Sequence, residues 1–363
     1  MTTDLGMPAG SPPSGTAGVP RLADEDARQT KKEFTSDQEV RWCPGCGDYA
    51  ILAAVQGFLP DLGLKRENIV FVSGIGCSSR FPYYPDTYGM HSIHGRAPAI
   101  ATGLATSRGD LSVWVVTGDG DALSIGGNHL IHALRRNVNL KILLFNNRIY
   151  GLTKGQYSPT SELGKITKST PNGSADSPFN PISLALGAEA SFVARTIDSD
   201  RKHLQAVLRS AANHQGSAFV EIYQNCNIFN DGAFDLLKEP ETRDAALIRL
   251  EHGQPITFGT SGEFCVVHPP GGFGLEVKPT TDVDPTEIVV HDETVAEPAY
   301  AFALSRLPSL DLSHSPIGVF RRVSRPTYDG LVRGQVDAAT SKVTEPELEL
   351  AGLLNSGDTW TIM

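Results

Sequence analysis

Apolar segments of strand length alternate with helix-like segments through the middle of this chain, and no other feature limits its possible folds as strongly. The strand-like segments are largely apolar along their whole length, without an apolar–polar alternation. They cover residues 68–73, 112–117, 140–145, 191–196 and 217–223. Strands of this kind are buried on both faces, which is typical of a parallel sheet covered by helices. The sequence therefore predicts an α/β fold with a helix-covered parallel sheet.

The segments between these strands have the composition and spacing of helices. The segment that starts at Pro98 carries a proline near its first turn, a position that helices tolerate. The predicted helices cover residues 48–59, 98–108, 124–136, 181–186 and 199–213.

The two ends of the chain lack this regular pattern. Residues 1–33 are rich in Gly, Pro, Ser and acidic residues, which predicts a disordered tail. The tail has no basic start and no apolar core, so it is not a secretory signal. Residues 235–363 are rich in proline and charge, with short strand-like pieces such as 287–291. We expect a binding domain at 34–234, followed by an irregular C-terminal extension that contacts a partner.

Charge and hydropathy exclude two classes of partner. The 363 residues include 31 Lys plus Arg and 41 Asp plus Glu, which gives a formal net charge of −10. Binding of nucleic acid requires clustered positive charge, so a nucleic-acid partner is not expected. No run approaches the roughly 18 apolar residues of a membrane-spanning helix, so we expect no membrane partner and a cytoplasmic location.

Residues that can carry chemistry follow the predicted strands at the points where the strands end. The segments 74–77, 118–121, 146–147 and 224–226 each come directly after a strand and contain Gly, Asp, Asn, Gln or Cys. In open α/β sheets, ligands bind beyond the carboxyl ends of the strands, which lie at one edge. The sequence therefore predicts a binding site at that edge.

Two of these segments indicate a site for a metal ion and a phosphate group. Asp119 and Asn147 follow successive strands, and a right-handed crossover places such residues side by side. Carboxylate, amide and carbonyl oxygens are the ligands that Mg²⁺ takes. Gly118 and Gly120 allow the backbone to approach phosphates, and the helix opening at 124–127 offers N–H groups to an anion. The alternative, a plain turn and a strand-end cap, leaves the spacing of the two motifs unexplained.

Cysteine spacing leaves several interpretations open. Cys43 and Cys46 form a C-x-x-C motif at the start of the first helix, while Cys77 and Cys226 stand alone after strand ends. Four thiolates suit a [4Fe–4S] cluster or a structural zinc ion, and a C-x-x-C motif alone suits a redox dithiol. They could also be unliganded core thiols. Zinc usually takes two close pairs of cysteines, a pattern that this chain lacks. Cys265 lies in an apolar stretch and is expected in the core.

Taken together, these motifs resemble the beta subunits of the 2-oxoacid:ferredoxin oxidoreductases, and most closely the 2-oxoglutarate branch. The resemblance covers about 34–234 and implies a sheet of the thiamine-diphosphate-binding (PP) type. The motifs that carry it are 42–47, 75–78, 94–98, 118–120 with 146–147, and 151–156.

The resemblance implies a role for each of these motifs. Asp119, Asn147 and the carbonyl of Ile149 would hold Mg²⁺. The cluster is implied in preference to zinc, with Cys43, Cys46, Cys77 and Cys226 as its ligands. The residues implied to contact thiamine diphosphate are Ile75, Gly76, Cys77, Ser78, His94, Gly95, Gly118, Asp119, Gly120, Asp121, Gly151 and Leu152.

Other polar residues near these motifs were weighed for a role. A 2-oxo-dicarboxylic substrate needs partners for its carboxylates, and Lys154 and Arg80 are the available cations, although loop cations are more often simply solvated. His91 is expected to be structural. His129 and His132 are expected to be partly exposed on a helix.

The implied activity is the oxidative decarboxylation of a 2-oxoacid with coenzyme A, with electrons leaving through the cluster to ferredoxin. Thiamine enzymes also need a Glu at the aminopyrimidine ring, usually from a partner domain. Only one set of strands is visible here, so we expect an alpha subunit and a dimer of heterodimers. Two alternatives stay open. One is a non-oxidative thiamine-diphosphate decarboxylase or synthase subunit, and the other is a zinc-stabilised binding module without catalysis.

Overall fold

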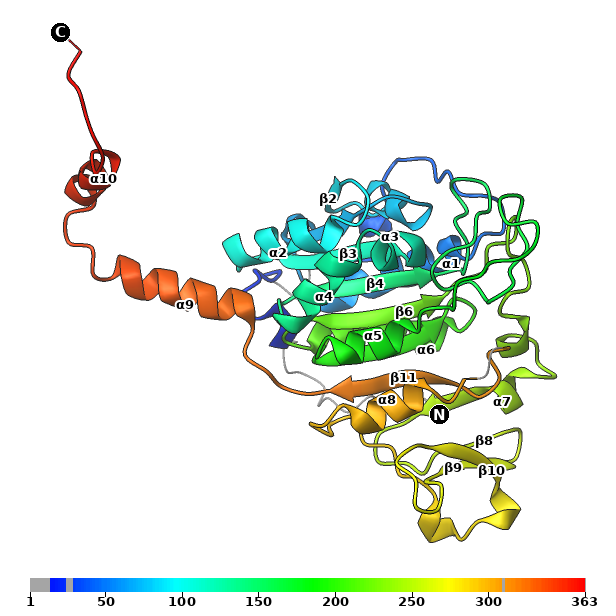
Figure 1. Ribbon diagram of the computed structural model, residues 1–363. Helices are drawn as coiled ribbons and strands as arrows, with labels where there is room; N and C mark the ends of the chain where they lie inside the picture. The colour runs from blue at the N-terminus through cyan, green and yellow to red at the C-terminus, as the bar shows by residue number, and fades with distance from the viewer. Residues whose placement is uncertain (1–13, 24–28, 309–310, 363) are drawn as a thin grey trace.

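An eight-stranded sheet forms the centre of the computed structural model, which describes residues 14–23, 29–308 and 311–362. The strands lie in the order β2-β1-β3-β4-β6-β5-β11-β7 (Figure 1). From β2 to β5, all neighbouring strands are parallel, whereas β11 runs antiparallel to β5 and parallel to β7. The strand bounds are β1 Ile69–Ser73, β2 Tyr88–His91, β3 Ser112–Gly118, β4 Lys141–Asn146, β5 Phe192–Ile197, β6 Ala218–Tyr223, β7 Leu247–Leu250 and β11 Ser315–Arg322.

Helices cover both faces of the sheet, as predicted (Figure 1). On β3, Trp114 and Val116 belong to the hydrophobic core beneath α1 and α6, while Val113 and Val115 belong to the core beneath α2, α4, α5 and α8. Strand residues of both parities are therefore buried, which is why the strands are apolar along their whole length. The helices are α1 Asp48–Phe58, α2 Ala97–Ser107, α4 Gly127–Arg135, α5 Pro181–Gly187, α6 Arg201–Asn213 and α8 Ala299–Ser305.

The predicted strands are all present within two residues of their expected bounds, but β2 was not predicted. Its residues are exposed, so they form no apolar run that could mark a strand in the sequence. The helix predicted at 124–136 is present as α4, which starts at Gly127, and it is preceded by a short helix that was not predicted, α3, Asp119–Leu123. Residues 287–291 make only isolated bridges, such as the one between Val267 and Ile288.

The C-terminal extension is more regular than the sequence predicted, since it supplies β7 and β11 to the main sheet. The apolar centre of β11 is short and flanked by Pro316 and by two arginines, of which Arg321 is buried, and this composition hides the strand. The chain between β7 and β11 forms a separate, small antiparallel sheet with its strands in the order β10-β9-β8. Its strands are β8 Thr257–Phe258, β9 Phe264–Val267 and β10 Glu276–Pro279, and the short helix α7 spans Arg243–Ala246.

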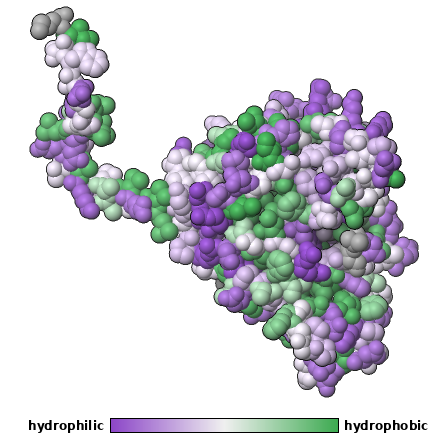
Figure 2. All heavy atoms as spheres, viewed as in Figure 1, coloured by the Kyte–Doolittle hydropathy of each residue, from purple (hydrophilic) through white to green (hydrophobic). Residues whose placement is uncertain are grey.

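The chain ends in an arm that leaves the body of the molecule (Figure 1). The arm contains α9, Tyr328–Thr340, which packs against α2, and α10, Pro346–Leu354, which buries none of its residues. Figure 2 shows the arm standing apart from the body, with apolar residues along it. No helix in the described part of the chain is long and apolar enough to cross a membrane.

Part of the expected disordered tail is ordered. Thr16 and Val19 are buried, and the Arg21 guanidinium donates hydrogen bonds to the Leu62 carbonyl and to Thr16 Oγ1, both at 3.1 Å. This contact attaches the segment to the body through polar bonds, which its composition alone did not reveal. Residues 1–13 and 24–28 of the expected tail lie outside the described residues.

Candidate functional site

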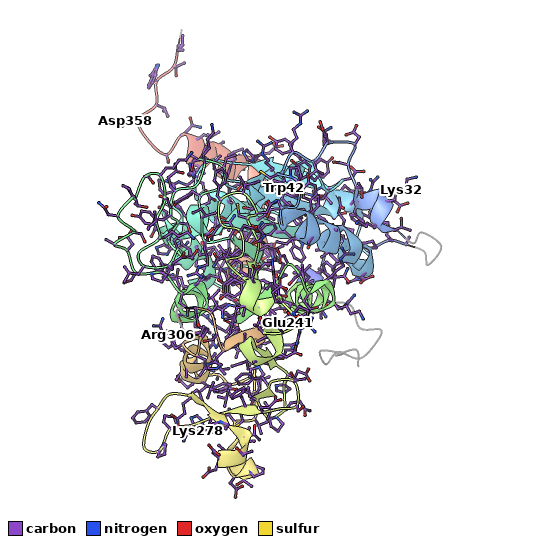
Figure 3. All side chains as sticks on the ribbon, turned by 90° about the vertical axis from the view of Figure 1, so that its right-hand side faces the viewer. Lys32, Trp42, Glu241, Lys278, Arg306 and Asp358 are labelled. Carbon is purple, nitrogen blue, oxygen red and sulfur yellow. The ribbon has the colours of Figure 1, made fainter. Side chains whose placement is uncertain are left out.

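A pocket of about 500 Å³ opens at the carboxyl edge of the parallel strands, the edge that Figure 3 turns toward the reader. The predicted convergence is confirmed, because the segments after β1, β3 and β4 all line this one pocket. Asp48, Phe145, Tyr150 and Thr153 line it without having been predicted. The predicted residues that line it are Ile75, Gly76, Cys77, Ser78, His94, Gly118, Asp119, Gly120, Asp121, Asn147, Ile149, Gly151 and Leu152.

Asp121 holds the walls of the pocket together. Its Oδ1 accepts hydrogen bonds from the backbone N–H groups of Ile75, at 3.2 Å, and Gly95, at 2.9 Å. The same oxygen lies 3.1 Å from His94 Nδ1. A side chain at position 74 would collide with Asp121, because a Cβ on Gly74 would lie 1.9 Å from Oδ2. Within this chain, Asp121 and Gly95 therefore shape the site for a ligand by bonding to each other.

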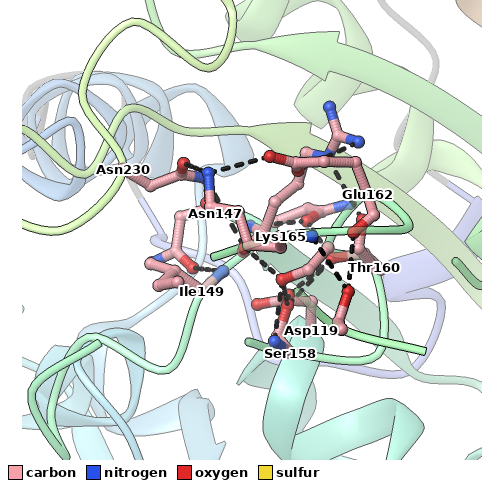
Figure 4. Close-up of polar contacts among 12 residues, drawn as sticks. Asp119, Asn147, Ile149, Ser158, Thr160, Glu162, Lys165 and Asn230 are labelled. Carbon is pink, nitrogen blue, oxygen red and sulfur yellow. Dashed lines mark hydrogen bonds and ion pairs between the residues drawn. The ribbon is translucent and has the colours of Figure 1, made fainter. Parts of the chain in front are cut away.

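Asp119 is a buried carboxylate at the start of α3. Its Oδ2 accepts hydrogen bonds from Ser158 Oγ, at 2.5 Å, and from Thr160 Oγ1, at 2.6 Å (Figure 4). Burial raises the pKa of Asp119, and the two hydroxyl donors oppose that rise. Ser158 and Thr160 come from the long loop between β4 and α5 and were not predicted. A run of hydroxyl residues was their only signal in the sequence.

A tight turn after β4 presents the other two predicted metal ligands. Asn147 Oδ1 accepts a hydrogen bond from the Ile149 N–H at 3.2 Å, and Arg148 between them has a left-handed φ of 58°. Asn230 Nδ2 donates to the Asn147 carbonyl at 2.9 Å, which holds the turn from outside (Figure 4). Asn147 and Ile149 thus line the same pocket as Asp119, as the crossover geometry predicted.

Two expectations about the phosphate-binding backbone need correction. The space beside Gly120 is filled by this chain's own Tyr150, since a Cβ there would lie 2.1 Å from the Tyr150 ring. Residues 124–127 do not line the pocket. Gly126 instead packs against the backbone of Gly95. A Cβ on either glycine would prevent this close packing. The backbone that lines the pocket is 118–121, because the helix after β3 begins at Asp119.

The cysteines gather beside the pocket. A Cβ on Gly151 would lie 3.4 Å from Cys77 Sγ and 3.7 Å from Cys226 Sγ, so both sulfurs border the same glycine. Gln224 Nε2 donates to Cys46 Sγ at 3.2 Å, which ties the C-x-x-C segment to the segment that carries Cys226. The prediction that these segments meet at one edge is confirmed.

Cys43 completes the group at the surface. The Cys46 N–H donates to the Cys43 carbonyl at 3.0 Å, and the five cysteines of the chain are free thiols. Burial raises the pKa of Cys46 and raises that of Cys77 to about 12. A redox dithiol needs a lowered pKa, so the raised pKa of Cys46 argues against a redox role for the C-x-x-C motif. Among the described residues, no three His, Cys, Asp or Glu side chains are placed to share a single metal ion.

Asp48 lies between the cysteines and the pocket and was missed by sequence reasoning. It is the first residue of α1, is 1% exposed and lines the pocket. Neither of its oxygens has a hydrogen-bond partner in the described part of the chain. Burial, reinforced by Asp198, raises the pKa of Asp48 to about 7 although the Cys46 thiol lies nearby. A carboxyl group left in this state is costly unless a ligand supplies a donor.

The two expected substrate cations lie outside the pocket. Lys154 is exposed in the loop after Thr153 and has a left-handed φ of 77°. Arg80 lines a neighbouring surface cavity, which shares Ile75, Gly76 and Leu152 with the pocket.

The remaining histidines and Cys265 take the expected places. His91 Nδ1 lies 2.9 Å from the Ser79 carbonyl, so this ring has a structural contact. His129 and His132 are partly exposed on α4, and Cys265 is buried in β9.

Similarity to known proteins agrees with this geometry. The model of the thiamine pyrophosphate enzyme C-terminal TPP-binding domain matches residues 74–222, which include most of the pocket. The chain is 65% identical to the 2-oxoglutarate oxidoreductase subunit KorB of Mycobacterium tuberculosis over 365 residues, 100% of this chain and 96% of the relative. It belongs to the 2-oxoacid:ferredoxin oxidoreductase beta-subunit family. It is an oxidoreductase subunit with a thiamine-diphosphate-binding domain.

Two further relatives support this membership. A beta subunit of a 2-oxoacid:ferredoxin oxidoreductase from Sulfolobus sp is 46% identical over 192 residues, 52% of this chain and 63% of the relative. The structure of the 2-oxoglutarate:ferredoxin oxidoreductase of Magnetococcus marinus, with 2-oxoglutarate, coenzyme A and succinyl-CoA bound, superposes with a TM-score of 0.73 at 31% identity. That match covers 92% of this beta subunit and 99% of the other chain.

Proposed function

We propose that this beta subunit serves a coenzyme A-dependent 2-oxoglutarate:ferredoxin oxidoreductase. The observation that carries the proposal is the convergence of Asp119, Asn147 and Ile149 in one pocket with Cys77 in its wall. The similarity to the 2-oxoglutarate enzymes named above favours 2-oxoglutarate as the substrate. Bound thiamine diphosphate supplies an electron sink for decarboxylation, and this chain positions it.

The donor set fits Mg²⁺ and a diphosphate. Asp119 offers a carboxylate, Asn147 an amide oxygen and Ile149 a carbonyl, which are the hard ligands that Mg²⁺ prefers. Ser158 and Thr160 fix one oxygen of Asp119 and so orient the carboxylate. The diphosphate would face the backbone of 118–121.

The cysteines fit a [4Fe–4S] cluster. Cys43, Cys46, Cys77 and Cys226 offer four soft ligands, and such a cluster supplies one-electron transfer. Cys77 lines the pocket while Cys43 is exposed, so the group extends from the pocket to the protein surface. This arrangement suits the delivery of electrons to an external ferredoxin. The non-oxidative alternative leaves the four cysteines unexplained, and the family membership argues against the zinc-stabilised binding module.

The partner side of the proposal rests on what this chain lacks. In the described residues, the pocket wall holds no Glu that could face an aminopyrimidine ring. We therefore propose an alpha subunit that closes the site, within a dimer of heterodimers. Arg80 and Lys154 are proposed to meet the substrate carboxylates when the site is closed. All five cysteines are free, which suits the reducing cytoplasm.

Reconstitution with the alpha subunit tests this function. The anaerobically purified beta subunit alone should show no 2-oxoacid-dependent reduction of a viologen dye, and addition of the alpha subunit should produce turnover that depends on coenzyme A. Among 2-oxoglutarate, pyruvate and branched-chain 2-oxoacids, 2-oxoglutarate should give the highest kcat/KM. Turnover by the isolated beta subunit, or turnover without coenzyme A, would instead favour the non-oxidative alternative.

A further inference from the structure

A second cavity, of about 730 Å³, lies behind the turn that carries the proposed magnesium ligands. Asn146 and Thr160 line this cavity, and Thr160 Oγ1 donates a hydrogen bond to Asp119, which lines the thiamine pocket. Thr160 therefore lies between the two cavities. None of the described residues that line this cavity also lines the thiamine pocket, so the two are distinct.

Positive charge dominates the lining of this cavity. Arg148, Arg195 and Arg306 line it together with a single carboxylate, Glu221. Both oxygens of Glu221 are already engaged, one by Asn146 Nδ2 and the other by Arg195 Nε, each at 2.7 Å. With Glu162, which pairs with Arg148, also counted, the three guanidinium groups exceed the two carboxylates by one positive charge, in a chain whose formal net charge is −10.

The central guanidinium is held in a fixed orientation. Arg195 is 1% exposed and lies over the rings of Tyr223, at 5.0 Å, and Phe320, at 5.5 Å. Its Nη1 donates to the Pro316 carbonyl at 3.3 Å, whereas its Nη2 has no hydrogen-bond partner among the described residues. A buried arginine of this kind is already ordered before a ligand binds, which lowers the entropy cost of binding.

The other two guanidinium groups also keep donors available. Arg148 uses Nε for the Thr160 carbonyl, at 3.1 Å, and Nη2 for Glu162, at 3.4 Å. The guanidinium of Arg306, at the end of α8, has no hydrogen bond or ion pair in the part of the chain that the structure describes, whereas the Arg306 backbone N–H donates to the Ala303 carbonyl at 3.1 Å. Planar guanidinium forks match carboxylate and phosphate oxygens in a bidentate manner.

Apolar side chains also line the cavity, among them Phe179, Pro181 and Leu312. From the guanidinium groups and these apolar side chains, we propose that the cavity binds an organic anion that carries two or more carboxylate or phosphate groups. An inorganic ion would leave the apolar side chains without a contact. This proposal does not depend on the proposed thiamine chemistry, because no residue of it holds the metal or the cofactor.

Calorimetry on the full-length chain, with no cofactor added, tests the proposal. The two probes, used separately, are tricarballylate, a tricarboxylate, and adenosine 3′,5′-bisphosphate. We expect one-to-one binding of at least one probe, and its identity tells carboxylate from phosphate recognition. Arg306→Gln should weaken that binding about tenfold, since it removes charge-assisted hydrogen bonds. Arg306→Lys should weaken it less.

The matched control is Arg201→Gln, an exposed arginine on α6 outside the cavity. It should leave binding unchanged. Arg306 lies at the surface, so its replacement does not threaten folding. The proposal is overturned if neither probe binds at millimolar concentration, or if the affinity is the same in Arg306→Gln as in the unmodified chain.

Discussion

The two edges of the parallel sheet both hold buried polar side chains, but these side chains differ in their hydrogen-bond partners. At the amino edge, Lys141 Nζ donates to Asn139 Oδ1 at 2.7 Å and to the His214 carbonyl at 2.8 Å. At the carboxyl edge, Asp48 has no partner for either oxygen among the described residues. Unpartnered buried atoms also occur at the amino edge, at Arg321 Nε and Arg322 Nε of β11, but Asp48 leaves both oxygens of a carboxyl group unpartnered in the wall of a pocket. Such a group is costly unless a ligand supplies a donor. We therefore expect substitutions at the carboxyl edge to affect ligand binding and substitutions at the amino edge to affect stability.

The largest difference between the edges should appear on removal of a proposed cluster ligand. Cys226→Ala should lower the iron content of the anaerobically purified chain and abolish dye reduction in the complete enzyme, because a four-iron cluster depends on its fourth thiolate. Iron analysis and the viologen assay measure these effects. Cys265→Ala, in a buried strand away from the site, is the matched control and should change neither. Full iron content in Cys226→Ala would contradict the ligand assignment.

A smaller but still large effect is expected at Asp119. Asp119→Ala removes the charged magnesium ligand, so the affinity for thiamine diphosphate in the presence of Mg²⁺ should fall on the order of 100-fold. Asn147→Ala should weaken binding less, because an amide is a poorer ligand. Thr160→Val should weaken it about tenfold by freeing the Asp119 carboxylate. Calorimetry measures all three, and unchanged binding in Asp119→Ala would rule out this magnesium site.

The carboxyl edge also shows which parts of the fold and of the site could be predicted from the sequence. The strands and the meeting of Asp119 with Asn147 were predictable, because apolar runs and chain order alone determine which residues follow which strand. The partners of Asp119 were not predictable, since Ser158 and Thr160 sit in a loop without periodicity. The packing of Tyr150 against Gly120 has no local signal either.

Strands of the extension were hidden for a related reason. The buried Arg321 within β11 donates a hydrogen bond to the Ala190 carbonyl at 2.7 Å. This partner allows an arginine, which the sequence alone would place at the surface, to lie inside the molecule. The order of the C-terminal extension therefore depends on tertiary partners. Truncation after Ser341 would remove α10 and leave β11 in the main sheet, so this variant tests whether the end of the arm contacts a partner.

At the amino edge, the expected effect is on stability and not on binding. Asn137 is buried with a left-handed φ of 53° and accepts hydrogen bonds from Ser191 Oγ, at 2.5 Å, and from the Ser217 N–H, at 3.0 Å. Asn137→Ala should lower the free energy of unfolding by about 2–4 kcal/mol and leave thiamine diphosphate affinity unchanged. Denaturant unfolding measures the first quantity. Asn128→Ala, on the exposed side of α4, is the control. A loss of cofactor affinity in Asn137→Ala would break the division between the edges.

The smallest expected effect is a pH dependence carried by His214 at the same edge. Burial, together with repulsion by Lys141 and Arg322, lowers the pKa of His214 to about 3. The ring lies 2.7 Å from Ser191 Oγ. Between this pKa and the ordinary value of 6.5, the unfolded chain binds one proton more than the folded chain. His214 should therefore lower the free energy of unfolding by about 1–2 kcal/mol as the pH decreases from 6.5 to 5. His203 and His291, whose pKa values burial lowers to about 4, should add to the fall in the same direction. His214→Gln should reduce this slope, whereas His129→Gln on α4 should retain it. An equal slope in His214→Gln and the unmodified chain would show that the buried imidazole does not control acid stability.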